Sequence, residues 1–168
     1  MKKIDPRINQ AIFLFNDIYI DGIPLLVHEK SAFLSFILVI TAIEALSGYR
    51  YEKGNLEHRF KSFIEEYFPE EYKMHSDNLW EFRKKMVHAF SPSSFALIHN
   101  HPHLHFSKAP DGLTILNADD FYKALKYAAE IYFKDLSNNN SIQAAMIKRL
   151  GDEYNGGSIG VFTIKKQQ

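Results

Sequence analysis

Residues 32–46, Ala-Phe-Leu-Ser-Phe-Ile-Leu-Val-Ile-Thr-Ala-Ile-Glu-Ala-Leu, form the longest apolar stretch of the chain. Only one serine, one threonine and Glu44 interrupt it. The stretch is too short to span a membrane and carries a charge, so it predicts a helix in a protein core. We expect this helix over about residues 29–47, with Gly48 as its C-terminal cap. Because it is apolar almost all round, it should be the central and most buried element.

The composition of the 168-residue chain limits what kind of protein it can be. Hydrophobic residues make up 46% and aromatic residues 14%, which predicts one globular domain over residues 1–168. The absence of Cys excludes a disulfide scaffold and a thiolate metal site. It is compatible with a reducing cytoplasm, and residues 1–7 lack the apolar core of a signal peptide, so we expect a cytoplasmic protein without membrane contact. The 20 basic residues balance 20 acidic ones, which argues against a sequence-blind binder of duplex DNA.

Helical periodicity, together with start and stop signals, predicts further helices. The first follows Asp5-Pro6, which resembles an N-cap with Pro at the first helical position. Another follows the cap residue Asn55 and stops before Pro69. The remaining predicted helices cover about residues 72–90, 118–136 and 141–150.

The segment after Pro92 changes character. Residues 95–98 and 104–106 are predicted as short strands around a Pro-containing turn, and residues 113–116 and 158–164 are candidates for further strands. The predicted fold class is therefore mostly α. It is a helical bundle of about five to six helices, with a small β-hairpin insertion before the penultimate helix.

Arg83 and His88 are separated by four residues near the end of the helix expected over residues 72–90. Arg can hold a phosphate through two parallel hydrogen bonds and His can move a proton near neutral pH, so the pair suits phosphodiester cleavage. On a regular helix five residues turn about 500°, which leaves the two side chains about 140° apart. They converge only at a distorted helix end or across two copies, so we expect a homodimer that buries a face of this helix. The bare spacing also arises by chance, and a solvated helix face is the alternative.

Three segments resemble the HEPN superfamily (higher eukaryotes and prokaryotes nucleotide-binding), whose small helical bundles often carry Arg-x4-6-His. They are an early buried helix with an internal acid at residues 42–46, the segment Trp80-x2-Arg83-x4-His88 followed by Ala-Phe-Ser-Pro, and a closing helix that includes residues 121–125. The resemblance extends over roughly residues 30–136, and its middle segment is the specific one. It implies a metal-independent endoribonuclease that acts as a dimer, with two motifs lining one cleft. Such domains serve in toxin–antitoxin, phage-defence or RNA-processing roles, so an antitoxin protein is a further candidate partner.

The resemblance assigns the motif roles to Arg83 and His88. A ribose 2′-OH would attack the adjacent phosphorus, with His88 as general base or acid and Arg83 stabilising the charge on the phosphate. The nucleophile belongs to RNA, so no metal or cofactor is expected, and the product is a 2′,3′-cyclic phosphate. The family often has Asn or Asp after the motif Arg, whereas this chain has Lys84, which could add affinity for phosphate. The departure favours the alternative function, a non-catalytic HEPN-like module that binds RNA, nucleotide or a partner protein.

Glu44 and a run of histidines complete the candidate residues. A carboxylate on an apolar helix needs a partner, so we expect Glu44 to be largely buried and bonded to a cationic or amide group, with a role in orienting Arg83 left open. The run His-Asn-His-Pro-His-Leu-His at residues 99–105 suggests a metal site. Its proline interrupts any regular strand and no Cys or nearby carboxylate completes a ligand set, so a polar hairpin without metal is expected. His101 or His103 could contact RNA beside Arg83.

Overall fold

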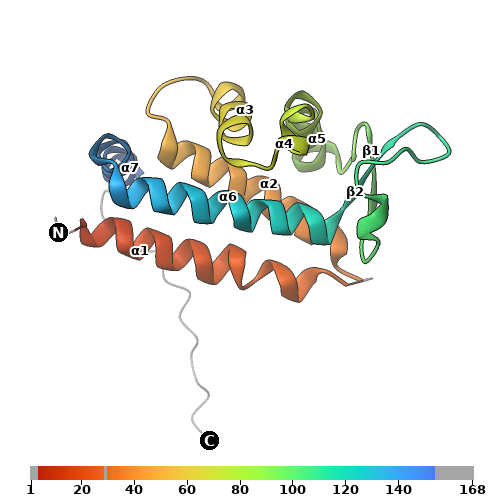
Figure 1. Ribbon diagram of the computed structural model, residues 1–168, viewed down its shortest axis with the longest axis horizontal. Coiled ribbons are helices and arrows are strands. Elements are labelled where there is room, and N and C mark those ends of the chain that lie inside the picture. The colour runs from red at the N-terminus through yellow and green to blue at the C-terminus, as the bar shows by residue number, and fades with distance from the viewer. Residues whose placement is uncertain (1–3, 29, 154–168) are drawn as a thin grey trace, which may run out of the picture.

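The computed structural model describes residues 4–28 and 30–153 and shows a mostly helical protein (Figure 1). It is 71% helical, with seven α-helices and one small sheet in this part of the chain. The predicted mostly α class with a small β insertion before the penultimate helix is therefore confirmed. The helix count exceeds the predicted five to six. The strand predicted at 158–164 lies outside the described residues.

The elements follow one another in a simple order. The helices are α1 (Pro6–Phe15), α2 (Ala32–Arg50), α3 (Leu56–Tyr67), α4 (Glu70–Lys73), α5 (Ser76–Ala89), α6 (Ala118–Asn138) and α7 (Asn140–Glu153). The strands β1 (Phe95–Ile98) and β2 (Thr114–Asn117) lie between α5 and α6. A π-helix (Asn16–Ile20) continues α1, and 3-10 turns occupy Ile23–Leu26 and Pro102–Leu104.

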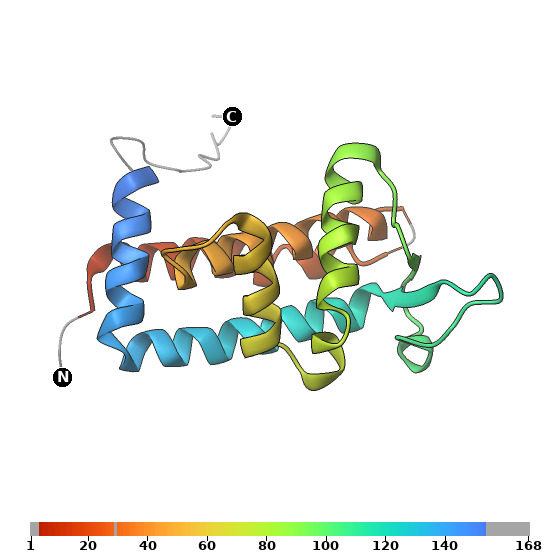
Figure 2. The same ribbon diagram turned by 90° about the horizontal axis from the view of Figure 1, so that it is seen from above.

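The long helices set the shape of the molecule. Helices α1, α2 and α6 run lengthwise, whereas α3 and α5 cross over α2 (Figures 1 and 2). Helix α7 lies across one end, and the sheet extends from the other end (Figure 2). Helix α2 therefore borders α3, α5, α6 and α7 at once. Any polar group on its outer face is positioned among several helices.

Helix α2 is the central element, as its apolar sequence predicts. Phe36, Ile40, Ile43 and Leu46 are all buried in the hydrophobic core. The predicted end of the helix was wrong, because Gly48 lies inside α2 and the helix continues to Arg50. The helix can continue there because the Tyr51 N–H still bonds to the Ser47 carbonyl, so no left-handed glycine cap is needed.

By length and mean hydropathy (1.8), α2 is the one helix among the described residues that could cross a membrane. A core helix passes the same test. The burial of α2 against the other helices is that of a core helix.

Two predicted helix starts are confirmed by their caps. The Asp5 carboxylate accepts a hydrogen bond from the Arg7 N–H (2.9 Å), and the Asn55 side chain accepts one from the His58 N–H (2.8 Å). The single helix predicted over residues 72–90 is wrong at its start, because α4 and α5 are separate. The His75 N–H bonds to the Tyr72 carbonyl (3.0 Å), which tightens the chain into a turn before α5 begins.

The β insertion differs from the predicted hairpin. Strands β1 and β2 pair in parallel, from Phe95 opposite Thr114 to Ile98 opposite Asn117. Residues 104–106 form no strand, because Leu104 ends the 3-10 turn Pro102–Leu104 and the next two residues form a turn. The Phe106 N–H still donates to the Ile115 carbonyl of β2 (2.8 Å). Residues 99–113 instead form an arm that returns the chain to the same edge as β1, which parallel pairing requires. Phe95 and Leu116 are buried and anchor the insertion to the core.

Candidate functional site

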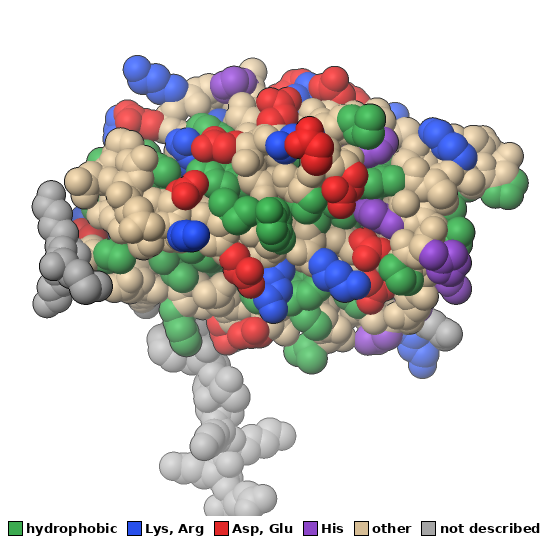
Figure 3. All heavy atoms as spheres, in the orientation of Figure 1, with side chains coloured by type: hydrophobic (Ala, Val, Ile, Leu, Met, Phe, Trp, Pro, Cys, Tyr) green, Lys and Arg blue, Asp and Glu red, His purple; other side chains and the backbone are tan. Residues whose placement is uncertain are grey.

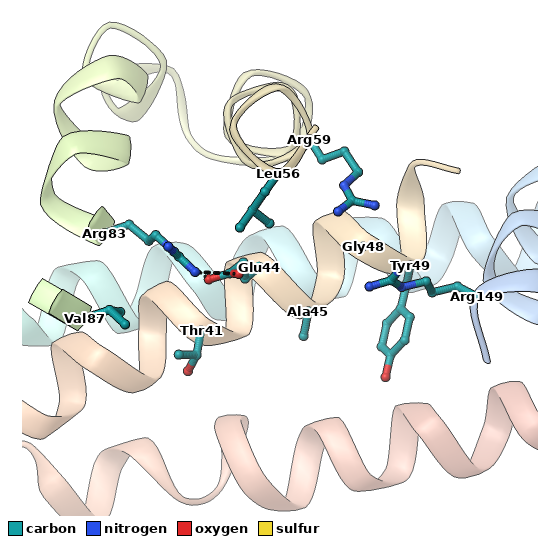
Figure 4. Close-up of a pocket in the computed structure, with 10 residues that line it drawn as sticks. All are labelled: Thr41, Glu44, Ala45, Gly48, Tyr49, Leu56, Arg59, Arg83, Val87 and Arg149. Atoms are coloured by element: carbon teal, nitrogen blue, oxygen red, sulfur yellow. Dashed lines mark hydrogen bonds and ion pairs between the residues drawn. The ribbon is translucent and has the colours of Figure 1, made fainter. Parts of the chain in front are cut away.

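A hollow of about 420 Å³ opens between helices α2, α3, α5 and α7 (Figure 4). We call it the arginine pocket, because its lining includes Arg59 from α3, Arg83 from α5 and Arg149 from α7. Glu44 is the only carboxylate among the residues that line it. Arg59 and Arg83 alone outnumber this carboxylate, and the excess of positive charge favours an anionic ligand.

Arg83 and Glu44 form the best-defined interaction in the arginine pocket. Arg83 Nε donates to Glu44 Oε2 at 2.7 Å and Nη2 donates to Oε1 at 2.8 Å, so the pair is bidentate. The Arg83 and Glu44 side chains are 15% and 23% exposed, respectively. The prediction that Glu44 is largely buried and bonded to a cation is therefore confirmed. The pairing also explains how an apolar helix carries a carboxylate, because the charge is neutralised where water is scarce.

The geometry of this pair leaves part of the Arg83 guanidinium available. A guanidinium carries five N–H groups, and the bonds to Glu44 use one on Nε and one on Nη2. The Nη1 edge can still form a second, end-on pair of hydrogen bonds with an anion. The guanidinium carbon also lies 5.5 Å from the centre of the Trp80 ring, a cation–π contact that adds to the interactions of Arg83. Glu44 thus acts as an anchor that fixes the direction in which Arg83 points.

Arg59 and Arg149 approach the pocket from the opposite side. In Figure 4 their guanidinium groups both point towards Gly48, whose lack of a side chain keeps the surface of α2 low there. Arg59 Nε is buried and has no hydrogen-bond partner among the described residues. A buried donor without an acceptor is costly, so this atom is a natural contact for a bound anion.

Helices α2 and α3 are held together at the end of the pocket by a separate network. Arg50 Nε donates to the Tyr67 hydroxyl (2.8 Å), Arg50 Nη2 donates to Glu66 (2.7 Å), and the Tyr51 hydroxyl donates to the same carboxylate. Burial raises the pKa of Tyr67 to about 12, so its hydroxyl stays protonated. Burial acts against ionisation of Glu66, but hydrogen bonds from Tyr51 and Arg50 outweigh it and lower the pKa of that carboxyl. The network ties the C-terminal end of α2 to α3, two of the helices between which the pocket opens.

His88 does not line the arginine pocket. Helix α5 stays regular up to Ala89, and the His88 side chain is exposed outside the hollow. Within one chain, His88 therefore does not reach the free edge of Arg83. The spacing on a regular helix predicts this divergence. Lys84 also points elsewhere. Its ammonium pairs with Glu81 and lies 5.9 Å from the centre of the Trp80 ring.

The histidine run belongs to the β insertion and not to the pocket. His101 and His103 are exposed, and their rings lie 5.9 Å apart around the 3-10 turn. Neither lines the arginine pocket. His105 has turned inward, where its Nε2 lies 2.8 Å from the Tyr72 hydroxyl. The described residues contain no group of three or more His, Asp or Glu side chains placed to hold a metal ion.

Sequence reasoning missed Arg59 and Arg149. Arg149 belongs to the pair Lys148-Arg149, which resembles ordinary solvated surface. Arg59 directly precedes the buried Phe60, a position at the edge of the apolar face of α3. The period of the helix could have placed it at that edge, but not opposite Arg83, because the crossing of α3 over α2 is a tertiary property.

Comparisons of this chain with protein-family models, curated proteins and solved structures found no match.

Proposed function

We propose that the arginine pocket binds a phosphate group of RNA, and that the protein is a metal-independent endoribonuclease of the HEPN type that acts as a dimer. The observation that carries the proposal is the bidentate Glu44–Arg83 pair, which presents the free edge of a fixed guanidinium to the pocket. The buried Nε of Arg59 supplies a second donor for an anion. A phosphate offers several acceptor oxygens and can satisfy both groups at once.

Cleavage requires a group that moves a proton, and His88 is the candidate that the sequence places nearest to Arg83. Because His88 is exposed outside the pocket, it would serve the pocket of a second copy. Val87 and Phe90, its neighbours near the end of α5, are large exposed hydrophobic side chains that a second copy would cover. The ribose 2′-OH would lose its proton to His88 and form a bond to phosphorus, while Arg83 stabilises the charge on the phosphate. The bond from phosphorus to the 5′-oxygen would break, and that oxygen would take a proton from the protonated His88 or from water.

The second candidate function is a non-catalytic module that binds RNA, nucleotide or a partner protein such as an antitoxin. A specific observation favours it, because Arg83 and His88 do not meet within one chain. Lys84, which stands where the family often has Asn or Asp, is also engaged with Glu81. Both candidates can use the arginine pocket. Where the ligand is RNA, they differ in whether the bound RNA is cut. Both are also compatible with the cytoplasmic location that we propose.

The decisive experiment incubates labelled single-stranded RNA with the purified protein in excess EDTA. We expect products that end in a 2′,3′-cyclic phosphate. His88→Ala should lower the rate by about 10²-fold or more, and Arg83→Lys should lower it because the planar fork is lost. Lys85→Ala, an exposed change on the same helix, is the matched control. RNA binding without cleavage would support the non-catalytic module, and activity that EDTA removes would point to His101 and His103 instead.

The dimer is tested by mixing two inactive variants. Arg83→Ala and His88→Ala each destroy every site in their own homodimers. A mixed dimer would keep one complete site, with His88 from one copy and Arg83 from the other, so roughly a quarter of the activity should return. If Arg83 and His88 acted within one chain, the mixture would stay inactive. A protein that light scattering shows to be monomeric at tens of micromolar would also contradict a shared site.

Lys84 is tested by the variant Lys84→Asn, which restores the residue type common in the family. If Lys84 suppresses catalysis in this chain, the variant should cut RNA faster while it binds RNA with slightly lower affinity. An unchanged rate in both variant and wild type would show that the departure at this position is neutral for catalysis.

A further inference from the structure

A second hollow, of about 540 Å³, lies where α4, the β insertion and the first turns of α6 meet. We call it the aromatic hollow. It shares no lining residue with the arginine pocket. On the face shown in Figure 3, acidic and histidine side chains gather near this end of the molecule, close to the start of α6.

The polar groups in the floor of the hollow already form hydrogen bonds with one another. The Nδ1 atom of His105 accepts the Asn117 N–H (3.1 Å), and its Nε2 lies 2.8 Å from the Tyr72 hydroxyl. Burial lowers the pKa of His105, so the imidazole contributes no positive charge at neutral pH. Tyr72 itself is buried and stacks on Phe121, with ring centres 6.0 Å apart. The floor is therefore neutral and rigid.

The polar wall of the hollow is acidic. Glu71 from α4 and Asp120 from α6 both line it. One Asp120 oxygen, Oδ2, accepts a short hydrogen bond from the Asn117 amide (2.6 Å), which fixes the direction of the carboxylate. The other oxygen, Oδ1, lies 3.5 Å from Lys123 Nζ, beyond a good hydrogen bond.

The Lys123 ammonium occupies the position near Asp120 that a cationic ligand would take, but it interacts there only weakly. The Lys123 side chain is 67% exposed. It lies one helical turn after Asp120, as the i+3 member of an i, i+3 pair. Such exposed pairs contribute little and exchange readily with solvent. A ligand cation that entered the hollow could therefore replace Lys123 at Oδ1 without disturbing the hydrogen bond to Oδ2.

The apolar wall is aromatic. Phe106 and Tyr127 line the hollow, and Tyr127 is 50% exposed although it is a large ring. Phe106 is held in place by Tyr72, with ring centres 4.8 Å apart. Aromatic faces beside carboxylates attract cations, and a planar guanidinium can use both at once through stacking and paired hydrogen bonds.

We propose that the aromatic hollow binds a guanidinium group, with Glu71 and Asp120 as its carboxylate acceptors and Tyr127 as its stacking surface. The group comes either from a free alkylguanidine or from an arginine side chain of a peptide. The site is independent of RNA binding, because its ligand is a cation and its residues lie outside the arginine pocket.

The test is a titration of the ¹⁵N-labelled full chain, followed by amide chemical shifts. The probes are agmatine, as a free alkylguanidine, and a neutral capped Gly-Ser peptide with one central arginine. The citrulline version of the peptide has a neutral side chain of similar shape and is the matched ligand control. Sodium chloride of equal ionic strength controls for screening. We expect saturable shifts around residues 71, 105 and 120–127 with agmatine or the arginine peptide, and none with citrulline.

Four variants decide between a specific site and surface charge. Asp120→Asn keeps an acceptor for Asn117 and should weaken binding by about threefold or more. Tyr127→Ala should weaken it to a similar degree. Lys123→Gln should strengthen it by about two- to fivefold, because the internal competitor is removed. Glu130→Gln, an exposed change on the same helix, is the control and should leave binding unchanged.

Each outcome bears directly on the proposal. Saturation by the arginine peptide with little effect of agmatine would identify a peptide side chain as the source, and the reverse would identify a small molecule. Equal shifts with arginine and citrulline, or no loss with Asp120→Asn, would overturn the guanidinium site. Weaker binding in Lys123→Gln would also contradict it, because it would mean that the lysine helps to hold the ligand.

Discussion

The arginine pocket and the floor of the aromatic hollow place polar groups inside the same apolar bundle by opposite means. In the pocket, Arg83 meets Glu44 as a charged pair, and the guanidinium keeps N–H groups that the pair does not use. In the floor, the uncharged His105 ring has both nitrogens engaged, one by Tyr72 and one by the Asn117 N–H.

The difference separates a group that can recognise a ligand from one that supports the fold. A side chain with donors to spare can bind an additional partner without breaking an existing bond. A side chain whose donors and acceptors are all used stabilises what it already touches, and its removal strands two partners at once. The comparison therefore predicts that changes to the floor affect stability most, whereas changes to the pocket affect ligands most.

The largest loss of stability is expected for His105→Leu. Leucine fills similar space but can bond neither the Tyr72 hydroxyl nor the Asn117 N–H, and both residues are buried. We expect the free energy of unfolding to fall by about 2–4 kcal/mol. His103→Leu, two residues away on the exposed arm, is the matched control and should change it by less than about 0.5 kcal/mol. Urea unfolding followed by Trp80 fluorescence measures both, and equal effects would show that the floor is not a structural support.

A smaller loss is expected for Arg83→Met, because both members of the ion pair are partly exposed to water. We expect about 1–3 kcal/mol, mainly from the cost of leaving the Glu44 carboxylate without its partner. The double variant Arg83→Met with Glu44→Gln should recover part of this loss, since the stranded charge is gone. Losses that simply add in the double variant would show that the pair contributes no coupling energy. The double variant should not recover affinity for RNA, which should be lower than that of the wild type in both variants.

The sequence predicted some of these features and could not predict others, for identifiable reasons. The apolar composition of residues 32–46 predicts that Glu44 is largely buried and paired, but the arginine that pairs with it lies 39 residues later. Short-range signals around Pro102 favour a hairpin, whereas β1 in fact pairs with β2 in parallel across the arm. Arg59 and Arg149 join the pocket only because α3 and α7 cross α2. Periodicity thus predicts which face of a helix is buried, and packing decides what that face meets.

The smallest expected effect is the pH dependence that the floor confers. Burial lowers the folded-state pKa of His105 below its ordinary value, so the unfolded chain binds its proton first as the pH falls. The contribution to stability is complete above the ordinary pKa of about 6.5 and is lost as the pH falls through the lower folded-state pKa. His75, whose pKa burial also lowers, adds to the same trend.

We therefore expect the free energy of unfolding to decrease between pH 7.5 and pH 5.5, a window in which ordinary carboxylates remain ionised. His105→Gln keeps a donor and an acceptor but cannot titrate, so its stability should depend less on pH than that of the wild type. His103→Gln, on the exposed arm, should retain the wild-type slope. If His105→Gln showed the wild-type slope as well, the acid sensitivity would have to arise elsewhere. Protonation of His105 Nδ1 would then not disrupt the hydrogen bond from the Asn117 N–H. The floor would be stabilised by packing of its aromatic rings alone.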